Sequence, residues 1–138
     1  MERASTLRDA SVQDIQLELI RRSTHNAFDG EKVYQSLLKH RELWKAVLLD
    51  RAGVANYLKP GTLFMGSLIK LRDLPHNLWN ADTLFVLTVS PTAAERLAEI
   101  IASKEWGGEV QVHADREETD TALGTGRREY GLLSVWWD

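Results

Sequence analysis

The alternation of strand-like and helical segments in the second half of the chain constrains the fold most. Thr83–Val89 is a continuous apolar run, which is typical of a strand covered on both faces. Val110 and Val112 alternate with polar neighbours, as in a strand with one wetter face. Three predicted strands therefore alternate with two predicted helices: strands 83–89, 109–113 and 130–137, and helices 91–106 and 115–123. This β-α-β-α-β order favours an α/β fold with a small parallel or mixed sheet.

The first half of the chain predicts two helices and one short strand: helices 11–22 and 30–51, and strand 68–71. Val12, Ile15 and Leu19 recur at helical spacing in the first helix. Trp44 and Val47 belong to a broad apolar stripe in the second, which is typical of a helix packed into a core. Side chains that can cap a helix N-terminus stand before each predicted helix: Asp9 or Ser11, Asn26 or Asp29, Ser90, and Asp115.

The whole chain, residues 1–138, is expected to form a single α/β domain in which the two N-terminal helices precede the sheet. Residues 1–9 are polar and predict a flexible arm. No linker rich in Pro, Gly or Ser and no internal repeat divides the chain. Because crossover helices also occur over antiparallel sheets, a ferredoxin-like α+β fold is the alternative.

Composition excludes several classes of function. The net charge of −3 disfavours binding to nucleic acid. The chain has no cysteine, which excludes a disulfide scaffold, a thiolate zinc site and a cysteine nucleophile. Its histidines and carboxylates show no metal-ligand spacing, so we predict neither a metal site nor a cofactor. The polar N-terminus and the lack of an apolar run of about 20 residues predict a soluble, cytoplasmic protein with no membrane partner.

A polar break before the strand 83–89 is the first candidate site. Residues 73–82 include His76, Trp79 and Asp82. One interpretation is the rim of a pocket, with His76 as acid, base or ligand and Asp82 orienting it. The other is loop chemistry, in which Asp and Asn close turns and Trp79 covers the core. The second is favoured, because ligands of open parallel sheets bind at the carboxyl ends of strands, and this break lies at the amino end.

The second candidate lies at the carboxyl ends of two predicted strands. If strands 83–89 and 109–113 are parallel neighbours, Ser90, His113 and Asp115 approach one another at one edge and form a hydrolytic arrangement. Helix capping explains Ser90 and Asp115 more simply, which leaves His113 as a half-exposed residue at a strand end. No G-x-S-x-G pattern supports the hydrolytic interpretation.

Two further groups of side chains are candidates for binding. Arg127 and Arg128 follow two glycines and suggest a phosphate cradle, although no P-loop pattern is present. Trp136 and Trp137 are consecutive on the last predicted strand and therefore point to opposite faces of the sheet. If one face is open, one indole is exposed, and exposed Trp is favoured at protein interfaces.

With no catalytic signature in the chain, we expect a small intracellular protein-interaction module: an adaptor, an inhibitor or a neutralising partner. Its partner would be another protein or a second copy of the chain. The alternative is a small hydrolase or nucleotide-binding enzyme with His113 as base at the strand carboxyl ends. A cleft that contains His113 would favour the enzyme, and an apolar patch at Trp136 or Trp137 would favour the module.

Overall fold

Four antiparallel strands form one sheet in the spatial order β1-β2-β4-β3. The computed structural model describes residues 6–24, 27–49, 71–103, 106–113 and 130–137. The strands are β1 (Trp44–Leu49), β2 (Thr83–Thr88), β3 (Glu109–His113) and β4 (Gly131–Trp136). The helices are α1 (Val12–Arg21), α2 (Gly30–Lys39) and α3 (Pro91–Ser103), with short 3-10 helices η1 (Leu7–Asp9), η2 (Arg41–Leu43) and η3 (Leu71–His76).

The predicted parallel or mixed sheet is wrong, because every pairing among the described strands is antiparallel. The chain passes from β2 through α3 to β3, and these two strands run in the same direction, but β4 lies between them. Burial explains this order: β4 is apolar and covered on both faces, whereas β3 alternates between exposed and covered residues. A fully covered strand belongs inside a sheet and an alternating one tolerates its edge. The arrangement is mixed α+β, with an open antiparallel sheet.

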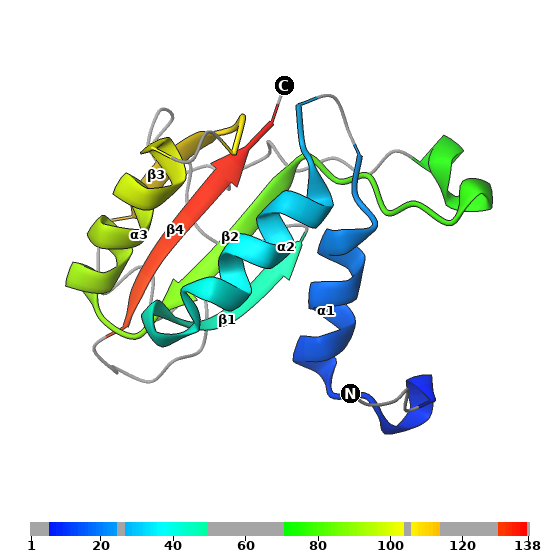
Figure 1. Cartoon of the computed structure of the whole chain (residues 1–138), viewed down its shortest axis with the longest axis horizontal. Coiled ribbons are helices and arrows are strands. Elements are labelled where there is room, and N and C mark those ends of the chain that lie inside the picture. Colours follow the sequence, from blue (N-terminus) through cyan, green and yellow to red (C-terminus); the bar gives the residue numbers. More distant parts are fainter. Residues whose placement is uncertain (1–5, 25–26, 50–70, 104–105, 114–129, 138) are drawn as a thin grey trace, which may run out of the picture.

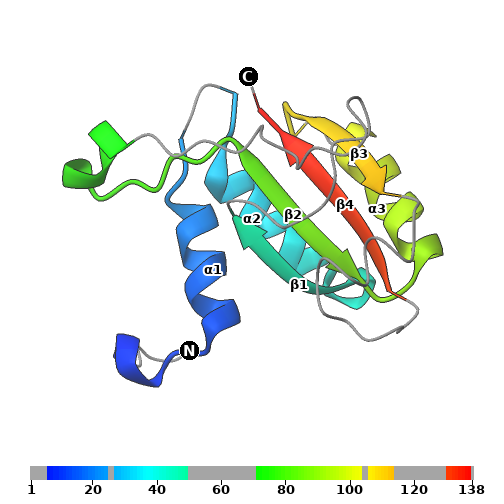
Figure 2. The same cartoon turned by 180° about the vertical axis from the view of Figure 1, so that it is seen from behind.

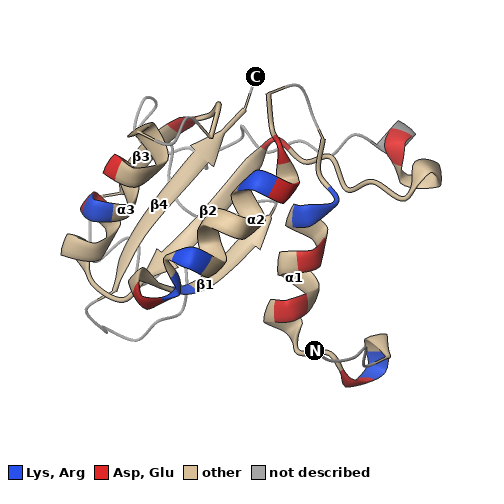
Figure 3. Cartoon of the chain, in the orientation of Figure 1, with Lys and Arg blue, Asp and Glu red and all other residues tan. Residues whose placement is uncertain are grey.

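The α2 and α3 helices lie on one face of the sheet, where the main core lies. Figure 1 shows α2 and α3 in front of the strands, and Figure 2 shows the same sheet from behind with both helices on its far side. Alternate strand residues such as Leu84, Val86 and Leu133 pack in one cluster with Leu37 and Leu97 of the helices. β2 and β4 carry no charged residue, so the charges of the described elements lie mainly on the helices (Figure 3).

The predicted helix 30–51 is wrong beyond Lys39. The α2 helix ends at His40, the chain turns through η2, and residues 44–49 form β1 at the edge of the sheet. A short apolar run such as Trp44–Leu49 suits a buried helix as well as a strand, and pairing with β2 decides between them. Trp44 is in the core, as predicted, and its Nε1 donates to the carbonyl of Leu37 at 2.8 Å.

Three predicted helix caps are confirmed. The Oγ of Ser11, the Oδ1 of Asp29 and the Oγ of Ser90 accept backbone N–H groups at the starts of α1, α2 and α3. These bonds satisfy donors that have no partner inside a helix. The last three residues of the predicted N-terminal arm form η1. Several sequence predictions fall outside the described residues: strand 68–71, helix 115–123, Asp115, Arg127 and Arg128.

Candidate functional site

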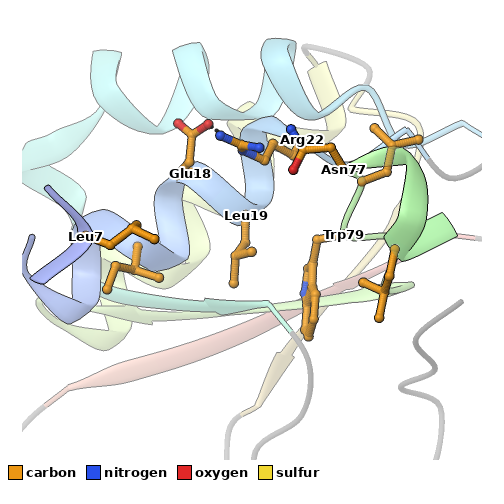
Figure 4. A pocket seen from close by; sticks show the side chains of 9 residues that line it. Leu7, Glu18, Leu19, Arg22, Asn77 and Trp79 are labelled. Carbon is orange, nitrogen blue, oxygen red and sulfur yellow. Dashed lines mark hydrogen bonds and ion pairs between the residues drawn. The ribbon is translucent and has the colours of Figure 1, made fainter. Parts of the chain in front are cut away.

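A pocket of about 340 Å³ lies between α1 and the segment that follows η3 (Figure 4). Leu7, Leu19 and Trp79 approach it from η1, α1 and the segment before β2. Six of the nine described residues that line it are aliphatic or aromatic: Leu7, Ile15, Leu19, Leu74, Leu78 and Trp79. The other three, Glu18, Arg22 and Asn77, are polar.

The α1 helix presents apolar side chains on two sides. Leu17 and Ile20 are buried in the core, whereas Ile15 and Leu19 line the pocket. Helical spacing places Val12 on the same side as Leu19, and Val12 is 77% exposed. The stripe that predicted this helix from the sequence therefore faces the pocket rather than the sheet. Other residues therefore cover this stripe only in part.

An ion-paired cluster forms the charged rim of the pocket. The carboxylate of Glu18 accepts hydrogen bonds from Arg21 and from Arg22, the latter at 2.7 Å. Arg21 also lies 3.6 Å from the carboxylate of Glu31 on α2. The hydrogen bond from Arg21 is the main reason why the pKa of Glu18 lies below its usual value. The rim is therefore charged but internally compensated at neutral pH.

The wall of the pocket that faces α1 includes Trp79. Hydrogen bonds from residues just after α1 hold this segment. The hydroxyl of Ser23 donates to the carbonyl of Trp79 at 2.6 Å, and the amide N–H of Thr24 donates to Oδ1 of Asn80 at 2.8 Å. Nδ2 of Asn80 donates in turn to Oδ2 of Asp73 at 2.9 Å. Ser23 and Asn80 are buried, so solvent competes little for these bonds. These hydrogen bonds therefore hold this wall of the pocket in place.

The polar break 73–82 contributes to this pocket, but not through the residues proposed for chemistry. Asn77 and Trp79 line it, whereas His76 is exposed and does not. Asp82 is buried and accepts hydrogen bonds from Trp136 Nε1 at 3.3 Å and from Thr83 at 2.8 Å. Asp82 therefore has a structural role, because its hydrogen bonds join the start of β2 to Trp136 of β4. Asn77 and Trp79 line the pocket, and Trp79 also packs against the core, as the loop interpretation predicted.

In the structure, Ser90 and His113 have other hydrogen-bond partners than the predicted arrangement gave them. Ser90 caps α3, and the expectation that His113 is half-exposed is wrong, since its side chain is 3% exposed. Nε2 of His113 lies 2.9 Å from Oγ of Ser134 on the neighbouring strand, and the ring stacks near Phe85 at 6.2 Å. Burial lowers the pKa of His113 to about 4, so the ring is neutral at pH 7.

Ser134 is the partner that the sequence did not reveal. A lone serine inside an apolar strand was a signal, because a buried hydroxyl requires a hydrogen-bond partner. Identifying that partner required the knowledge that β3 and β4 are neighbours, and the prediction had placed strand 109–113 beside strand 83–89.

The two consecutive tryptophans lie in different environments. Trp137 is fully buried, stacks on Phe28 with ring centroids 3.8 Å apart, and donates from Nε1 to the carbonyl of Trp106. Trp136 is only partly buried and reaches Asp82. Trp137 is therefore a core residue, and Trp136 remains the candidate contact residue of the pair.

The described lining of the pocket combines apolar side chains with ion-paired ones. Among the described residues that line it there is no Ser, Thr, His or Lys, and the carboxylate of Glu18 is held by two arginines. Within the described residues, no three His, Asp or Glu side chains are grouped to hold a metal ion. No helix in this part of the chain has the length and apolarity needed to cross a membrane.

Comparison with known proteins adds no functional assignment to this geometry. Searches against protein-family models, curated proteins and solved structures found no match.

Proposed function

We propose that this chain is a small intracellular protein-interaction module whose pocket between α1 and η3 binds an apolar side chain of a partner protein. The observation that carries this proposal is the open apolar stripe of α1. Ile15 and Leu19 line the pocket together with exposed Leu7, and Val12, on the same side of α1 as Leu19, is exposed as well. Apolar surface of this kind gains free energy when a partner covers it, at about 25 cal/mol per Å².

The size and chemistry of the pocket indicate the kind of anchor it takes. About 340 Å³ is at the lower end of the range for ligand sites and holds one or two aliphatic or aromatic side chains. The paired charges of Glu18 and Arg22 provide a polar rim, as at protein interfaces. The pocket wall is fixed by Ser23 and Asn80, so little ordering entropy opposes binding.

The test uses N-acetyl-leucine amide and N-acetyl-tryptophan amide as probes of an apolar anchor. Titration into the isotope-labelled chain should shift the methyl signals of Ile15, Leu19 and Leu78. A probe of this size should bind with a dissociation constant of about 1 mM. Leu19→Arg places a charge in the pocket and should abolish these shifts.

The matched control is Leu38→Arg, a change at a 41% exposed leucine on α2 that does not line the pocket. This variant should bind the probes as the unchanged chain does. Shifts that scatter over the molecule, or that persist in Leu19→Arg, would contradict the proposed site. So would the absence of shifts at probe concentrations of about 20 mM, well above the expected dissociation constant.

The hydrolase alternative rests on the contact between His113 and Ser134. A neutral imidazole 2.9 Å from a hydroxyl is the geometry of a base with its nucleophile. Ser134 is only 4% exposed and lies outside the pocket, which favours the binding proposal. A fluorophosphonate probe distinguishes the two, because an activated serine is labelled and Ser134→Ala removes the label. An unlabelled chain that binds the apolar probes supports the module.

A further inference from the structure

Two polar side chains that line the pocket carry hydrogen-bonding groups that the described part of the chain does not use. Nε of Arg22 donates to Glu18 at 2.7 Å, and its two Nη groups have no partner among the described residues. The backbone N–H of Asn77 donates to the carbonyl of Leu74 at 3.0 Å, whereas the side-chain amide of Asn77 bonds to no described residue. In Figure 4 both side chains lie along the upper side of the pocket, above Leu19 and Trp79.

The neighbouring carboxylate does not occupy these groups. Arg21 binds both oxygens of Glu18, with Nε donating to Oε1 at 2.9 Å and Nη2 donating to Oε2. Arg22 adds only its Nε to Oε2 of the same carboxylate. A guanidinium has five N–H donors, so four of those of Arg22 remain for a ligand. Paired donors of this kind match the two oxygens of a carboxylate, and a charged acceptor makes the stronger bonds.

Each wall of the pocket places an apolar side chain close to one of these polar groups. On α1, Leu19 and Arg22 are three residues apart, so their Cβ atoms are about 5–6 Å apart on one side of the helix. On the facing wall, Asn77 and Trp79 are two residues apart. A ligand that fits both walls has an apolar group and an anionic group close together. The last residue of a polypeptide has this form, because its side chain and its α-carboxylate share one Cα.

We propose that the pocket takes the C-terminal residue of a partner protein, with its apolar side chain against Leu19 and Trp79 and its α-carboxylate on Arg22 and Asn77. This inference rests on the proposed function and adds which residue of the partner binds. An internal residue has a neutral peptide group in place of the carboxylate, with one acceptor oxygen instead of two. Capture of a terminal carboxylate is a recurring mode of peptide recognition.

The test compares three acetylated tripeptides by the methyl shifts already described. The first ends in leucine with a free carboxylate, the second is the same peptide with a terminal amide, and the third has leucine in the middle and a glycine carboxylate at its end. The first should bind about tenfold more tightly than the other two, with a dissociation constant of about 0.1 mM. The net charge of −3 on the chain disfavours anions in general, so such a preference is local to the pocket.

Two variants test the residues that hold the carboxylate. Arg22→Gln removes the guanidinium and should abolish the tenfold preference, while binding of the amidated peptide changes by no more than about twofold. Asn77→Asp keeps the size of the side chain and places a negative charge in the pocket, so the amidated peptide should then bind more tightly than the acid. Asn77 has a φ of 65°, a conformation that Asp also adopts, and it is exposed, so this variant should fold.

The matched control is Arg96→Gln, which removes one positive charge from an exposed position on α3 that does not line the pocket. This variant should keep the preference for the acid. Equal binding of the first two peptides overturns the C-terminal inference but leaves the apolar pocket, whereas no binding of any peptide rejects the proposed function as well. Octanoate separates a small amphipathic acid from a chain terminus. Tighter binding of octanoate than of the leucine acid overturns the proposal. If Arg22→Gln does not fold, Asn77→Asp decides, and an unchanged preference in that variant overturns it.

Discussion

At the scale of single residues, His113 is the most informative position. As a half-exposed strand end, its replacement by Ala would cost less than about 1 kcal/mol. The structure instead buries the ring against Phe85 and bonds it to Ser134. We therefore expect His113→Ala to cost about 2–4 kcal/mol in the free energy of unfolding, because a cavity and a buried hydroxyl without this partner remain. Urea unfolding at pH 7.5 measures it.

The depressed pKa of His113 also makes stability depend on pH. In the folded chain this pKa is about 4, against the ordinary histidine pKa of 6.5, so the unfolded chain binds the proton more readily. The contribution of the neutral ring is complete above about pH 6.5 and is lost as the pH falls toward 4. From pH 7.5 to 4.5 the chain should lose about 2–3 kcal/mol through this group. In His113→Gln the loss should shrink by that amount, and an equal loss in both proteins would contradict the assignment.

Trp136 and Trp137 are adjacent in sequence but should contribute unequally to stability. Trp137→Ala removes the stack on Phe28 and should cost about 3–5 kcal/mol. Trp136→Ala removes a partly buried ring and one hydrogen bond to Asp82, and should cost about 1–2 kcal/mol. Denaturant unfolding of both variants compares them. Equal large losses would mean that both indoles are core residues and would remove Trp136 as a contact candidate.

At the scale of secondary-structure elements, the contact between α1 and α2 depends on Gly30. A Cβ at this position would lie 2.1 Å from the carbonyl oxygen of Ile20 and 2.5 Å from that of Ser23. Helix propensity alone favours Ala over Gly by about 1 kcal/mol. The clash is with backbone atoms, which cannot rotate away, so Gly30→Ala should instead lower stability by about 3 kcal/mol or more.

Thermal unfolding measures this effect, with Glu31→Ala at the neighbouring exposed position as the control. The control should change stability by no more than about 0.5 kcal/mol. An unchanged or raised melting temperature for Gly30→Ala would mean that α1 and α2 have room to separate.

The helix caps could be predicted from the sequence, whereas the strand β1 could not. Ser11, Asp29 and Ser90 could be predicted because capping is local: the side chain bonds to an N–H three residues away. The strand Trp44–Leu49 could not, because its apolar spacing suits a helix equally well and its partner β2 lies about forty residues along the chain. Long-range pairing decides such segments.

At the scale of the whole molecule, strand order limited what could be predicted of the site. The ranges of β2 and β3 were close to correct, but their adjacency was wrong, so His113 was matched with Ser90 instead of Ser134. The pocket was missed for a related reason. The apolar stripe of α1 was recognised from its spacing, but which side of the helix faces the sheet depends on Gln13 and Gln16 bonding to β1. Neither fact is local in sequence.

Binding and stability should separate cleanly in this molecule, because the pocket and the core use different residues of η1 and α1. Leu7 is 80% exposed and lines the pocket, whereas Leu17 is buried in the core. Leu7→Lys should therefore change the free energy of unfolding by no more than about 0.5 kcal/mol while it weakens binding of the leucine and tryptophan amides severalfold. Leu17→Lys buries an unpaired charge and should unfold the domain or cost several kcal/mol. A Leu7→Lys variant that is strongly destabilised would show that η1 belongs to the folding core, and one that binds the probes normally would place the anchor site deeper, against Leu19 and Trp79 alone.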